Sequence, residues 1–359
     1  MTQPLHEITI HQLRGIKNLT LSDLGSVNIL VGANNSGKTS VLEALATYAR
    51  PLDIYEWIST AWRREVNASR RSTVETLKWL FPQNKTSEDE VYHGQTFVSG
   101  KGKFAVEEVH AEFEDVFRIP QSKNHESLDD VDEGEQEHGA KLTVRIETMQ
   151  SSHTVVQSFE IWDTQNKPYP KANKPALPVV TITPVTHRTE QLSGISDLIK
   201  TKNKADVLEA LRMFDKGVRD IVILTPQGMR STLEIDHADF STTAPVSAFG
   251  DGMRRALTFA MTLPKVKGGL LLVDEIETAI HVSALQELYS WLVKVCKQND
   301  TQLFVTTHSL EAVDALLGAH SAPYDGLVAY RLGQAGIQTK RFSGEMLGRL
   351  RDEHGLDVR

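Results

Sequence analysis

A glycine-rich stretch near the start of the chain has the residue types and spacing of a phosphate-binding loop. Residues 27–31 form a Val-, Ile- and Leu-rich run that is typical of a buried parallel strand. The next eight residues, 32–39, read Gly-Ala-Asn-Asn-Ser-Gly-Lys-Thr and match G-x-x-x-x-G-K-[ST], and a helical run over 40–49 follows. Strand, loop and helix are the context that this pattern requires. A chance glycine-rich turn containing Lys-Thr would leave the flanking strand and helix unexplained.

Such a loop binds a nucleotide through its backbone and through two side chains. Glycines let backbone N–H groups point at an anion, and the start of the following helix adds a partial positive charge. We expect Lys38 to reach the β- and γ-phosphates of ATP and the Thr39 hydroxyl to bind Mg²⁺. The predicted nucleotide-binding residues are Asn34, Asn35, Ser36, Gly37, Lys38, Thr39 and Ser40.

Two later apolar runs end in residues that could complete this chemistry. Residues 270–273 lead into Asp274 and Glu275, and residues 302–306 lead into a Thr-His-Ser sequence that contains His308. An aspartate at the end of a buried parallel strand can hold Mg²⁺, and the glutamate after it can polarise an attacking water. A lone histidine is more often structural. Metal ligation by His308 is not expected, because no other ligand type clusters near it in the sequence.

A second small-residue loop lies between the phosphate loop and these two runs. Residues 247–255 read Ser-Ala-Phe-Gly-Asp-Gly-Met-Arg-Arg and open a helix, so they form another candidate anion site. The structural alternative is a glycine-rich turn before a helix.

The order of these segments resembles that of ABC-type ATPases of the RecF, SMC and OLD kind. The resemblance rests on residues 8–19 and 28–39, on the Asp-Glu pair, and on the later strand–Thr–His–Ser sequence. It implies an ATP sandwich, in which two heads enclose nucleotide between them. It also implies that His308 is a switch that senses the γ-phosphate, and that Arg14 lies near the nucleotide.

The same resemblance assigns a role to the loop before the helix. It implies a signature motif, which binds the γ-phosphate on the partner head, formed by Gly250, Asp251, Gly252 and Arg254. Gly250 stands where the family usually has serine, so that hydroxyl is missing, and the Gly-x-Gly-x-x-Arg form resembles OLD-type members. A Q-loop should follow the strand near 179–183. No glutamine stands there, and His187 and Arg188 are the nearest polar candidates.

We predict an α/β ABC-type P-loop ATPase head with an antiparallel β lobe, a parallel core sheet and an inserted segment. One ATPase domain would span 1–359, with the insertion at approximately 50–175 and an acidic loop at 126–138. A helix is expected over 205–218, followed by a buried strand at 221–224. Basic and aromatic residues interleave at 53–80. They could contact nucleic acid, but an amphipathic helical segment with a solvated basic face is the preferred interpretation.

Composition narrows the protein class. With 39 basic and 47 acidic residues, the net charge of −8 argues against a protein whose whole surface is basic and binds nucleic acid. The single cysteine, Cys296, falls on the apolar side of an expected helix and is interpreted as a core thiol. No apolar run is long enough to span a bilayer and no signal peptide is evident, so a cytoplasmic protein is expected.

Three functions remain open on this basis. The first is an ATPase similar to OLD-like ATPases of anti-phage defence, forming an ATP-linked homodimer and controlling a separately encoded effector. The second is a RecF-like DNA repair ATPase, against which the acidic balance and the lack of a long heptad run argue. The third is a non-catalytic, nucleotide-gated scaffold, against which Glu275 argues. A transporter subunit fits the RecF-like opening less well.

The expectation of a separate effector follows from the family resemblance. OLD-type proteins that cut nucleic acid carry a metal-dependent Toprim nuclease domain after the ATPase. Here 51 residues follow His308 (359 minus 308), and some of them, at 327–332 and 338–342, read as strands that finish the core. We therefore expect a second protein, with a nuclease as the expected class, docked on the insertion. Direct binding of nucleic acid is not indicated.

Overall fold

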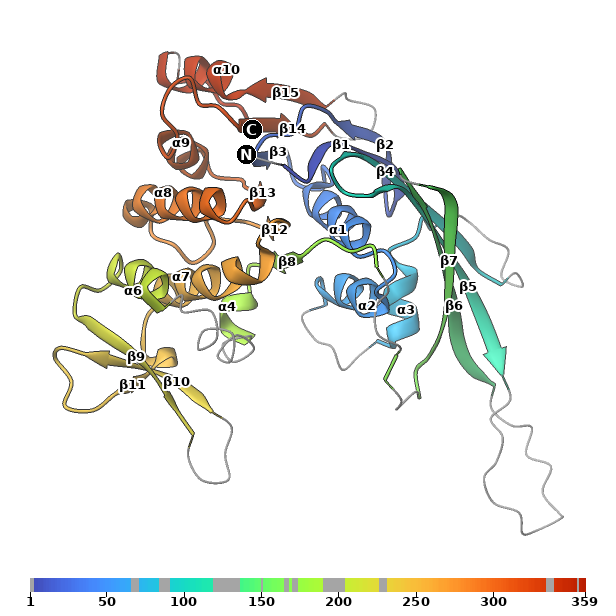
Figure 1. Cartoon of the computed structure of the whole chain (residues 1–359), viewed down its shortest axis with the longest axis horizontal. Helices are drawn as coiled ribbons and strands as arrows, with labels where there is room; N and C mark the ends of the chain where they lie inside the picture. Colours follow the sequence, from blue (N-terminus) through green and yellow to red (C-terminus); the bar gives the residue numbers. More distant parts are fainter. Residues whose placement is uncertain are drawn as a thin grey trace, which may run out of the picture. The chain divides into compact units, whose positions relative to one another are not determined.

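The computed structural model describes residues 3–65, 71–83, 91–118, 136–149, 151–164, 168–169, 174–189, 204–225, 231–333, 339–353 and 355–359. The chain divides into two compact units (Figure 1). Unit 1 comprises Met1–His6, Leu21–Leu42 and Leu177–Arg359, and unit 2 comprises Glu7–Thr20 and Glu43–Ala176. The expectation of one ATPase domain over 1–359 stays a prediction.

The core of unit 1 is a six-stranded sheet in the order β15-β14-β3-β13-β12-β8. Its strands are β3 (Val27–Val31), β8 (Val179–Ile182), β12 (Leu270–Val273), β13 (Gln302–Thr306), β14 (Leu327–Arg331) and β15 (Lys340–Ser343). All neighbouring pairs are parallel except β14 and β15. Every residue of β3, β12 and β13 is buried, as expected for strands covered on both faces. The predicted parallel core sheet is confirmed.

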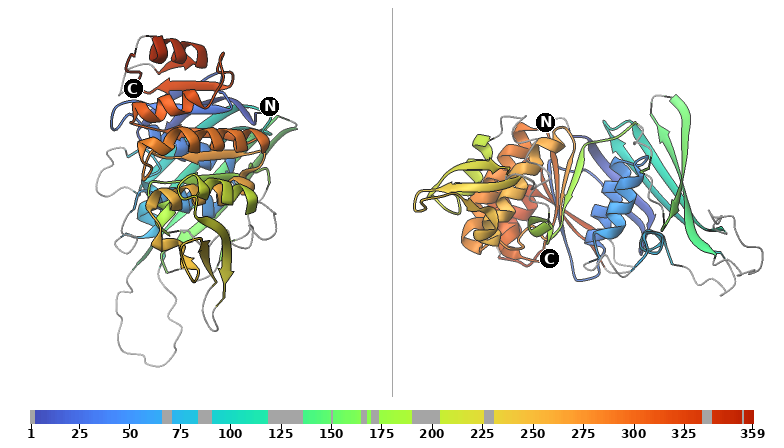
Figure 2. Two further views of the ribbon diagram at one scale, coloured as in Figure 1. Left: turned by 90° about the vertical axis from the view of Figure 1, so that its left-hand side faces the viewer. Right: turned by 90° about the horizontal axis from the view of Figure 1, so that it is seen from below.

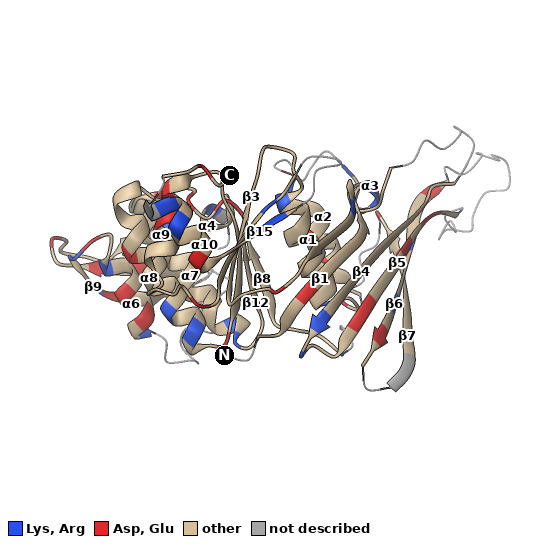
Figure 3. Cartoon of the chain, turned by 90° about the horizontal axis from the view of Figure 1, so that it is seen from above, with Lys and Arg blue, Asp and Glu red and all other residues tan. Residues whose placement is uncertain are grey.

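The described helices of unit 1 accompany this sheet. They are α4 (Thr186–Thr189), α6 (Lys204–Arg212), α7 (Asp251–Thr262), α8 (Val282–Gln298), α9 (Leu310–Gly318) and α10 (Gly344–Gly348), with short turns η1 (Val246–Ala248), η2 (Leu263–Val266) and η3 (Arg349–Glu353). Figure 3 shows α7, α8 and α9 on one face of the sheet. Helix α1 (Lys38–Ala49) begins in unit 1, at the end of the phosphate loop, and ends in unit 2. Cys296 is buried on α8, as predicted. Among the described helices, none combines the length and apolar character needed to cross a bilayer.

A small antiparallel sheet beside α6 was not predicted. It has the order β11-β10-β9, with β9 (Val218–Leu224), β10 (Thr232–His237) and β11 (Ala244–Pro245) (Figure 2). The prediction of a helix as far as Val218 is wrong: α6 ends at Arg212, and Val218 pairs with His237 as the first residue of β9. A turn between the two elements, in which Asp215 accepts a hydrogen bond from Gly217 N, redirects the chain. The strand predicted at 221–224 exists, but only Ile221 of it is fully buried.

Unit 2 contains an antiparallel sheet in the order β2-β1-β4-β5-β6-β7. Its elements are β1 (Leu5–Leu13, whose first two residues belong to unit 1), β2 (Ile16–Leu21), β4 (His93–Gly102), β5 (Val106–Arg118), β6 (Glu137–Thr148) and β7 (Ser151–Trp162), with helices α2 (Ile54–Trp62) and α3 (Thr73–Lys78). The inserted segment therefore supplies strands β4 to β7 of the predicted antiparallel lobe. The acidic loop predicted at 126–138 is too long at its end. Glu137 and His138 belong to β6, in which they pair with Arg118 and Phe117 of β5. Most of that loop lies outside the described residues.

The basic residues at 53–80 pair with nearby acids, and one of the tryptophans is buried. Trp57 is buried and stacks with Phe81, whereas Trp79 is exposed. Four described basic residues of this stretch form ion pairs: Arg63 with Glu56, Arg64 with Glu43, Arg71 with Glu65, and Lys78 with Asp115. Carboxylates already neutralise these cations, which favours the amphipathic interpretation over a phosphate-binding one.

Candidate nucleotide site

The predicted phosphate-chemistry residues of unit 1 meet at one edge of its parallel sheet. Strand β13 lies between β3 and β12, and all three run in the same direction. Their carboxyl ends therefore share an edge, which is where α/β sheets bind ligands. The phosphate loop follows β3, Asp274 and Glu275 follow β12, and His308 follows β13 after one further residue.

The phosphate loop holds a conformation that its glycines allow. Gly32 and Gly37 have φ angles of 143° and 92°, in a region that other residues rarely adopt. A side chain on Gly32 would also place its Cβ 2.6 Å from the carbonyl oxygen of Leu332. Asn35 has a left-handed backbone with φ 63°. Ala33, Asn34 and Asn35 are exposed, so the tip of the loop is open to a ligand.

Lys38 is buried at the base of the loop. Its Nζ donates to the carbonyl oxygens of Gly32 at 2.8 Å and Ala33 at 2.9 Å. Burial lowers the pKa of Lys38, while the carboxylates of Asp274 and Glu275 act in the opposite direction. The hydroxyl of Ser36 is buried and has no hydrogen-bond partner among the described residues. The Ser36 hydroxyl and the third N–H of the Lys38 ammonium therefore remain as donors for phosphate oxygens.

Asp274 lies between two threonine hydroxyls. Thr39 Oγ1 donates to Asp274 Oδ2 at 3.1 Å, and Thr306 Oγ1 donates to Asp274 Oδ1 at 2.5 Å. Thr39 and Asp274 thus bring a hydroxyl and a carboxylate together. Hard oxygen donors of this kind suit Mg²⁺, which usually completes its shell with nucleotide oxygens and water. The residues fit a magnesium ion bound with nucleotide.

Glu275 is exposed, and its backbone is held in an uncommon conformation. Its φ is 46°, which is the left-handed region. Its N–H donates to Thr306 Oγ1 at 2.8 Å, and its Oε2 accepts from the Thr278 hydroxyl at 3.2 Å. The carboxylate is therefore directed by its neighbours yet open to solvent, as a group that activates water must be.

His308 lies where β13 leads into α9. Its backbone N–H donates to Glu277 Oε1 at 2.9 Å, and Ser309 caps α9 by accepting from Ala312 N. The His308 imidazole is partly exposed and has no hydrogen-bond partner among the described residues. It could therefore respond to a phosphate placed at this edge.

The predicted signature loop opens helix α7. Gly250 is the N-cap residue, and no side chain caps that helix end. Asp251, in the first turn, accepts from Arg188 at 2.7 Å and from Arg254 at 3.0 Å. Arg188 was a Q-loop candidate, so the structure brings the signature and Q-loop candidates together in one head.

His187, the other Q-loop candidate, is buried. Burial lowers its pKa, and the charge of Arg255 lowers it further. Its Nε2 lies 3.7 Å from Asp251 Oδ2. A buried side chain of this kind is better placed to support the loop than to contact a ligand.

Arg14 forms its contacts within unit 2. At the β1–β2 turn, its guanidinium lies 2.7 Å from Glu43 Oε2 and donates to the carbonyl oxygen of Trp79 at 3.0 Å. Its φ of 51° is left-handed, and its N–H donates to Leu80 O. The nucleotide contact expected for Arg14 stays a prediction.

Sequence reasoning assigned no role to three polar residues of this site. Thr306 bridges Asp274 and Glu275, Glu277 holds the His308 backbone, and Arg255 donates to backbone oxygens on the same edge. Thr306 looks like an ordinary strand residue, and Arg255 appeared only as the last residue of the Gly-x-Gly-x-x-Arg sequence, without a role of its own. The Asp-Glu-x-Glu spacing was a usable signal for Glu277.

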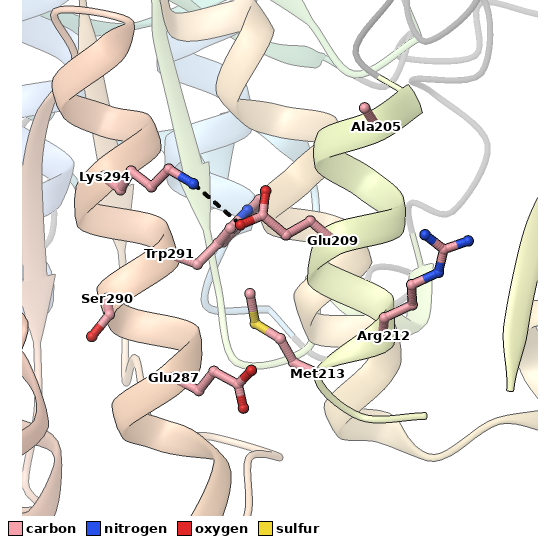
Figure 4. A pocket seen from close by; sticks show the side chains of 8 residues that line it. All are labelled: Ala205, Glu209, Arg212, Met213, Glu287, Ser290, Trp291 and Lys294. Atoms are coloured by element: carbon pink, nitrogen blue, oxygen red, sulfur yellow. Dashed lines mark hydrogen bonds and ion pairs between the residues drawn. The ribbon is translucent and has the colours of Figure 1, made fainter. Parts of the chain in front are cut away.

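A cavity of about 540 Å³ lies elsewhere in unit 1, between α6 and α8 (Figure 4). Met213 and Trp291 line it together with charged residues, among which Lys294 and Glu209 form an ion pair at 3.2 Å. Its lining includes none of the predicted site residues.

Comparison with known proteins identifies relatives of the chain and of its fold. Residues 27–314 match the family AAA_21, described as "AAA domain, putative AbiEii toxin, Type IV TA system". An "ATP/GTP phosphatase" of Helicobacter pylori is 20% identical over 332 residues, which cover 87% of each chain. The uncharacterized protein MJECL11 of Methanocaldococcus jannaschii is 35% identical over 112 residues, which cover 31% of this chain and 98% of that protein.

A solved structure shares the fold. The SMC head bound to the C-winged helix domain of ScpA matches with a TM-score of 0.50 and 12% identity, covering 94% of this chain and 98% of that one. The α/β fold expected for an ABC-type head is therefore confirmed.

Proposed function

Because the chain belongs to the AAA_21 family and is a P-loop ATPase, we propose that it hydrolyses ATP with Mg²⁺ at the edge formed by β3, β12 and β13. The observation that carries the proposal is the contact between Thr39 and Asp274, with Glu275 directly beside them. The relative named as an ATP/GTP phosphatase supports the same reaction class.

Each residue has a distinct task in this proposal. The loop N–H groups and Lys38 bind the β- and γ-phosphates, and Thr39 and Asp274 hold the metal. When bound, Mg²⁺ neutralises charge on the phosphates. The Glu275 carboxylate accepts a hydrogen bond from the attacking water and orients that water toward the γ-phosphate. His308 contacts the γ-phosphate. Thr306 fixes Asp274 and Glu275 relative to each other by hydrogen bonding to both.

The site also has an open side, which a second head could cover. Glu275 and the loop residues 33–35 are exposed in the single chain. We propose an ATP-linked homodimer in which the loop of Gly250, Asp251, Gly252 and Arg254 contacts the γ-phosphate held by the other head. The two heads would then come together only when ATP is bound, because the γ-phosphate supplies the contact that both heads share.

In the cell, we propose that the nucleotide state of this dimer controls a separate effector, in the manner of OLD-like defence ATPases. The family description names a toxin of a type IV TA system, which supports a role in defence. A nuclease is the proposed effector class.

Steady-state hydrolysis and ATP binding by the purified protein test the core of this proposal. Glu275→Gln should bind ATP with unchanged affinity and lose about 10²–10⁴-fold in rate, because it keeps the shape and loses the base. Lys38→Ala should lose productive binding. Glu287→Gln makes the same acid-to-amide change on the exposed face of α8 and serves as the control. Wild-type turnover by Glu275→Gln would refute the role of Glu275.

A further inference from the structure

Arg255 is a completely buried arginine on helix α7. Its side chain has 0% exposure, and none of the ion pairs found among the described residues involves it. Burying a guanidinium without a direct ion pair is costly, because water solvates the charge well. Burial lowers the pKa of Arg255 to about 10, although the nearby carboxylates of Asp274, Glu277 and Glu275 act in the opposite direction, so the group stays charged at neutral pH. A buried, charged arginine therefore calls for a role that an apolar side chain could not fill.

The partners of Arg255 are backbone carbonyl groups at the edge of the nucleotide site. Nη1 donates to the oxygen of Thr183, just after β8. Nη2 donates to the oxygens of Asp274 at 3.2 Å and Glu275 at 3.3 Å. One guanidinium thus joins the segment after β12 to the segment after β8.

The Glu275 backbone is the strained part of that segment. Its left-handed φ of 46° is unfavourable for a residue with a side chain. Thr306 accepts from the Glu275 N–H, and Arg255 donates to the Glu275 carbonyl oxygen. The peptide groups on both sides of the residue are therefore fixed, and they set the direction of the Cα–Cβ bond.

Anchoring of α7 does not require this arginine. The helix already buries an apolar face, formed by Met253, Ala256, Leu257, Phe259, Ala260 and Met261. Another apolar residue would extend that face, whereas a guanidinium can donate from separate nitrogens to carbonyl oxygens of two different segments. The contacts of Arg255 thus point to Glu275.

We propose that Arg255 is a positioning residue, which aims the Glu275 carboxylate of its own chain by fixing the Glu275 backbone. The inference rests on the proposed role of Glu275 in ATP hydrolysis. Arg255 itself touches neither nucleotide nor water in this proposal. Its loss should lower the rate of hydrolysis and leave ATP binding intact.

Substitution in the full chain gives the first test. Arg255→Lys keeps the charge but not the fork, and Arg255→Met keeps much of the length without any donor. Either variant should lower kcat by about 10- to 100-fold, because small displacements of a catalytic group have effects of this size. The ATP Kd, measured directly, should change less than about twofold. A fall in ATP affinity equal to the fall in kcat, or unchanged kcat in a folded Arg255→Lys protein, would overturn the proposal.

Arg212→Lys is the matched control. Arg212 also donates to two backbone carbonyl oxygens, those of Val218 at 2.9 Å and Arg219 at 2.8 Å, but it lies on α6 outside the site. The Arg212→Lys protein should keep the wild-type kcat. The thermal transition of each variant shows whether a protein is folded, and Arg255→Lys carries the test if Arg255→Met does not fold.

Mixed dimers then separate positioning of Glu275 from support of the signature loop. A Lys38→Ala chain mixed with a Gly250→Asp chain leaves one competent site, in which the Gly250→Asp chain supplies Glu275 and the other chain supplies the loop. Arg255→Lys should lower the rate of that site only when it is placed in the Gly250→Asp chain. An effect from the Lys38→Ala chain alone would overturn the positioning role.

The two ideas fail separately. If the unmodified mixture has no activity, the shared dimer site is wrong, and kcat and Kd of the uniform Arg255→Lys protein still decide the inference. If the mixture is active and Arg255→Lys has no effect in either chain, the inference fails and the dimer stands.

Discussion

The hydroxyl of Thr39 lies 3.1 Å from the carboxylate of Asp274, although 235 positions separate the two residues in the chain. If both ligate Mg²⁺, the hydroxyl matters and the methyl group does not. Thr39→Ser should keep Mg²⁺-dependent hydrolysis, and Thr39→Val should raise the Mg²⁺ concentration for half-maximal rate by about tenfold or more. Titration of hydrolysis with Mg²⁺ at saturating ATP measures this, and equal Mg²⁺ requirements for the two variants would contradict the assignment.

The trans role of the signature loop can be tested at Gly250. A Cβ on Gly250 would meet nothing within 4 Å, whereas one on Gly252 would lie 2.9 Å from Phe214. Aspartate is also a good N-cap residue, so Gly250→Asp should leave α7 intact while its charge repels a phosphate. We expect it to abolish hydrolysis and Gly250→Asn, of the same shape, to retain most of it.

Mixing completes that test. Combining Gly250→Asp with Lys38→Ala should restore activity, because one site of each mixed dimer keeps both good halves. The expected maximum, for random pairing of equal amounts, is about a quarter of the wild-type rate, since half of the dimers have one good site of two. Absence of any recovery, over a range of mixing ratios, would argue that the loop acts within its own chain.

Much of the site could be predicted because its residues follow fixed spacings at strand ends. A buried strand can be recognised from its apolar run, and parallel strands bring their carboxyl ends together. Lys38, Asp274 and His308 could therefore be placed on one edge of the sheet without a structure. The pairing of Arg188 with Asp251 could not be predicted, because it depends on how α4 meets the start of α7.

Arg254 and Arg255 show most clearly what could not be predicted from the sequence. They are neighbours in sequence with the same chemistry, yet Arg254 faces Asp251 and Arg255 is wholly buried. Only the rotation of α7 against the sheet distinguishes them. Similarly, the helix expected as far as Val218 had suitable apolar spacing, but tertiary pairing with β10 overrode that periodicity.

Glu43 should be important for the stability of unit 2. Its side chain is 1% exposed and lies 2.7 Å from both Arg14 and Arg64. Removing one partner from a buried ion pair leaves uncompensated charge, so Glu43→Gln should lower the free energy of unfolding by about 3 kcal/mol. Glu209→Gln is the control, because its pair with Lys294 is exposed and should contribute less than about 1 kcal/mol. Chemical denaturation of both variants measures the difference, and equal losses would refute it.

His320 should make stability depend on pH. Burial lowers its pKa below the ordinary value of 6.5. Between that value and the lower folded pKa, the unfolded chain takes up a proton and the folded chain does not, so stability falls as pH decreases through this window. His320→Gln should flatten the fall in Tm between about pH 7.5 and pH 5, part of which remains because the pKa of His187 is lowered too. An unchanged slope would show that His320 does not titrate in this way.

The proposed effector should bind according to nucleotide state. Glu275→Gln should accumulate the ATP-bound dimer and Lys38→Ala should not form it, so the two variants represent the two states of the switch. Purified with ATP from its native cell, one of them should retain a partner that the other lacks, and mass spectrometry identifies it. Glu287→Gln should behave like the wild type.

The same proposal predicts that the chain alone performs no effector chemistry. The purified protein should leave DNA and RNA intact with Mg²⁺ or Mn²⁺, with or without ATP, and cleavage should appear only when the partner is added. Contamination is a common source of nuclease activity, so Lys38→Ala must be purified in parallel. Cleavage that persists through further purification of the wild type and is absent from Lys38→Ala would place the effector chemistry in this chain and refute the proposal.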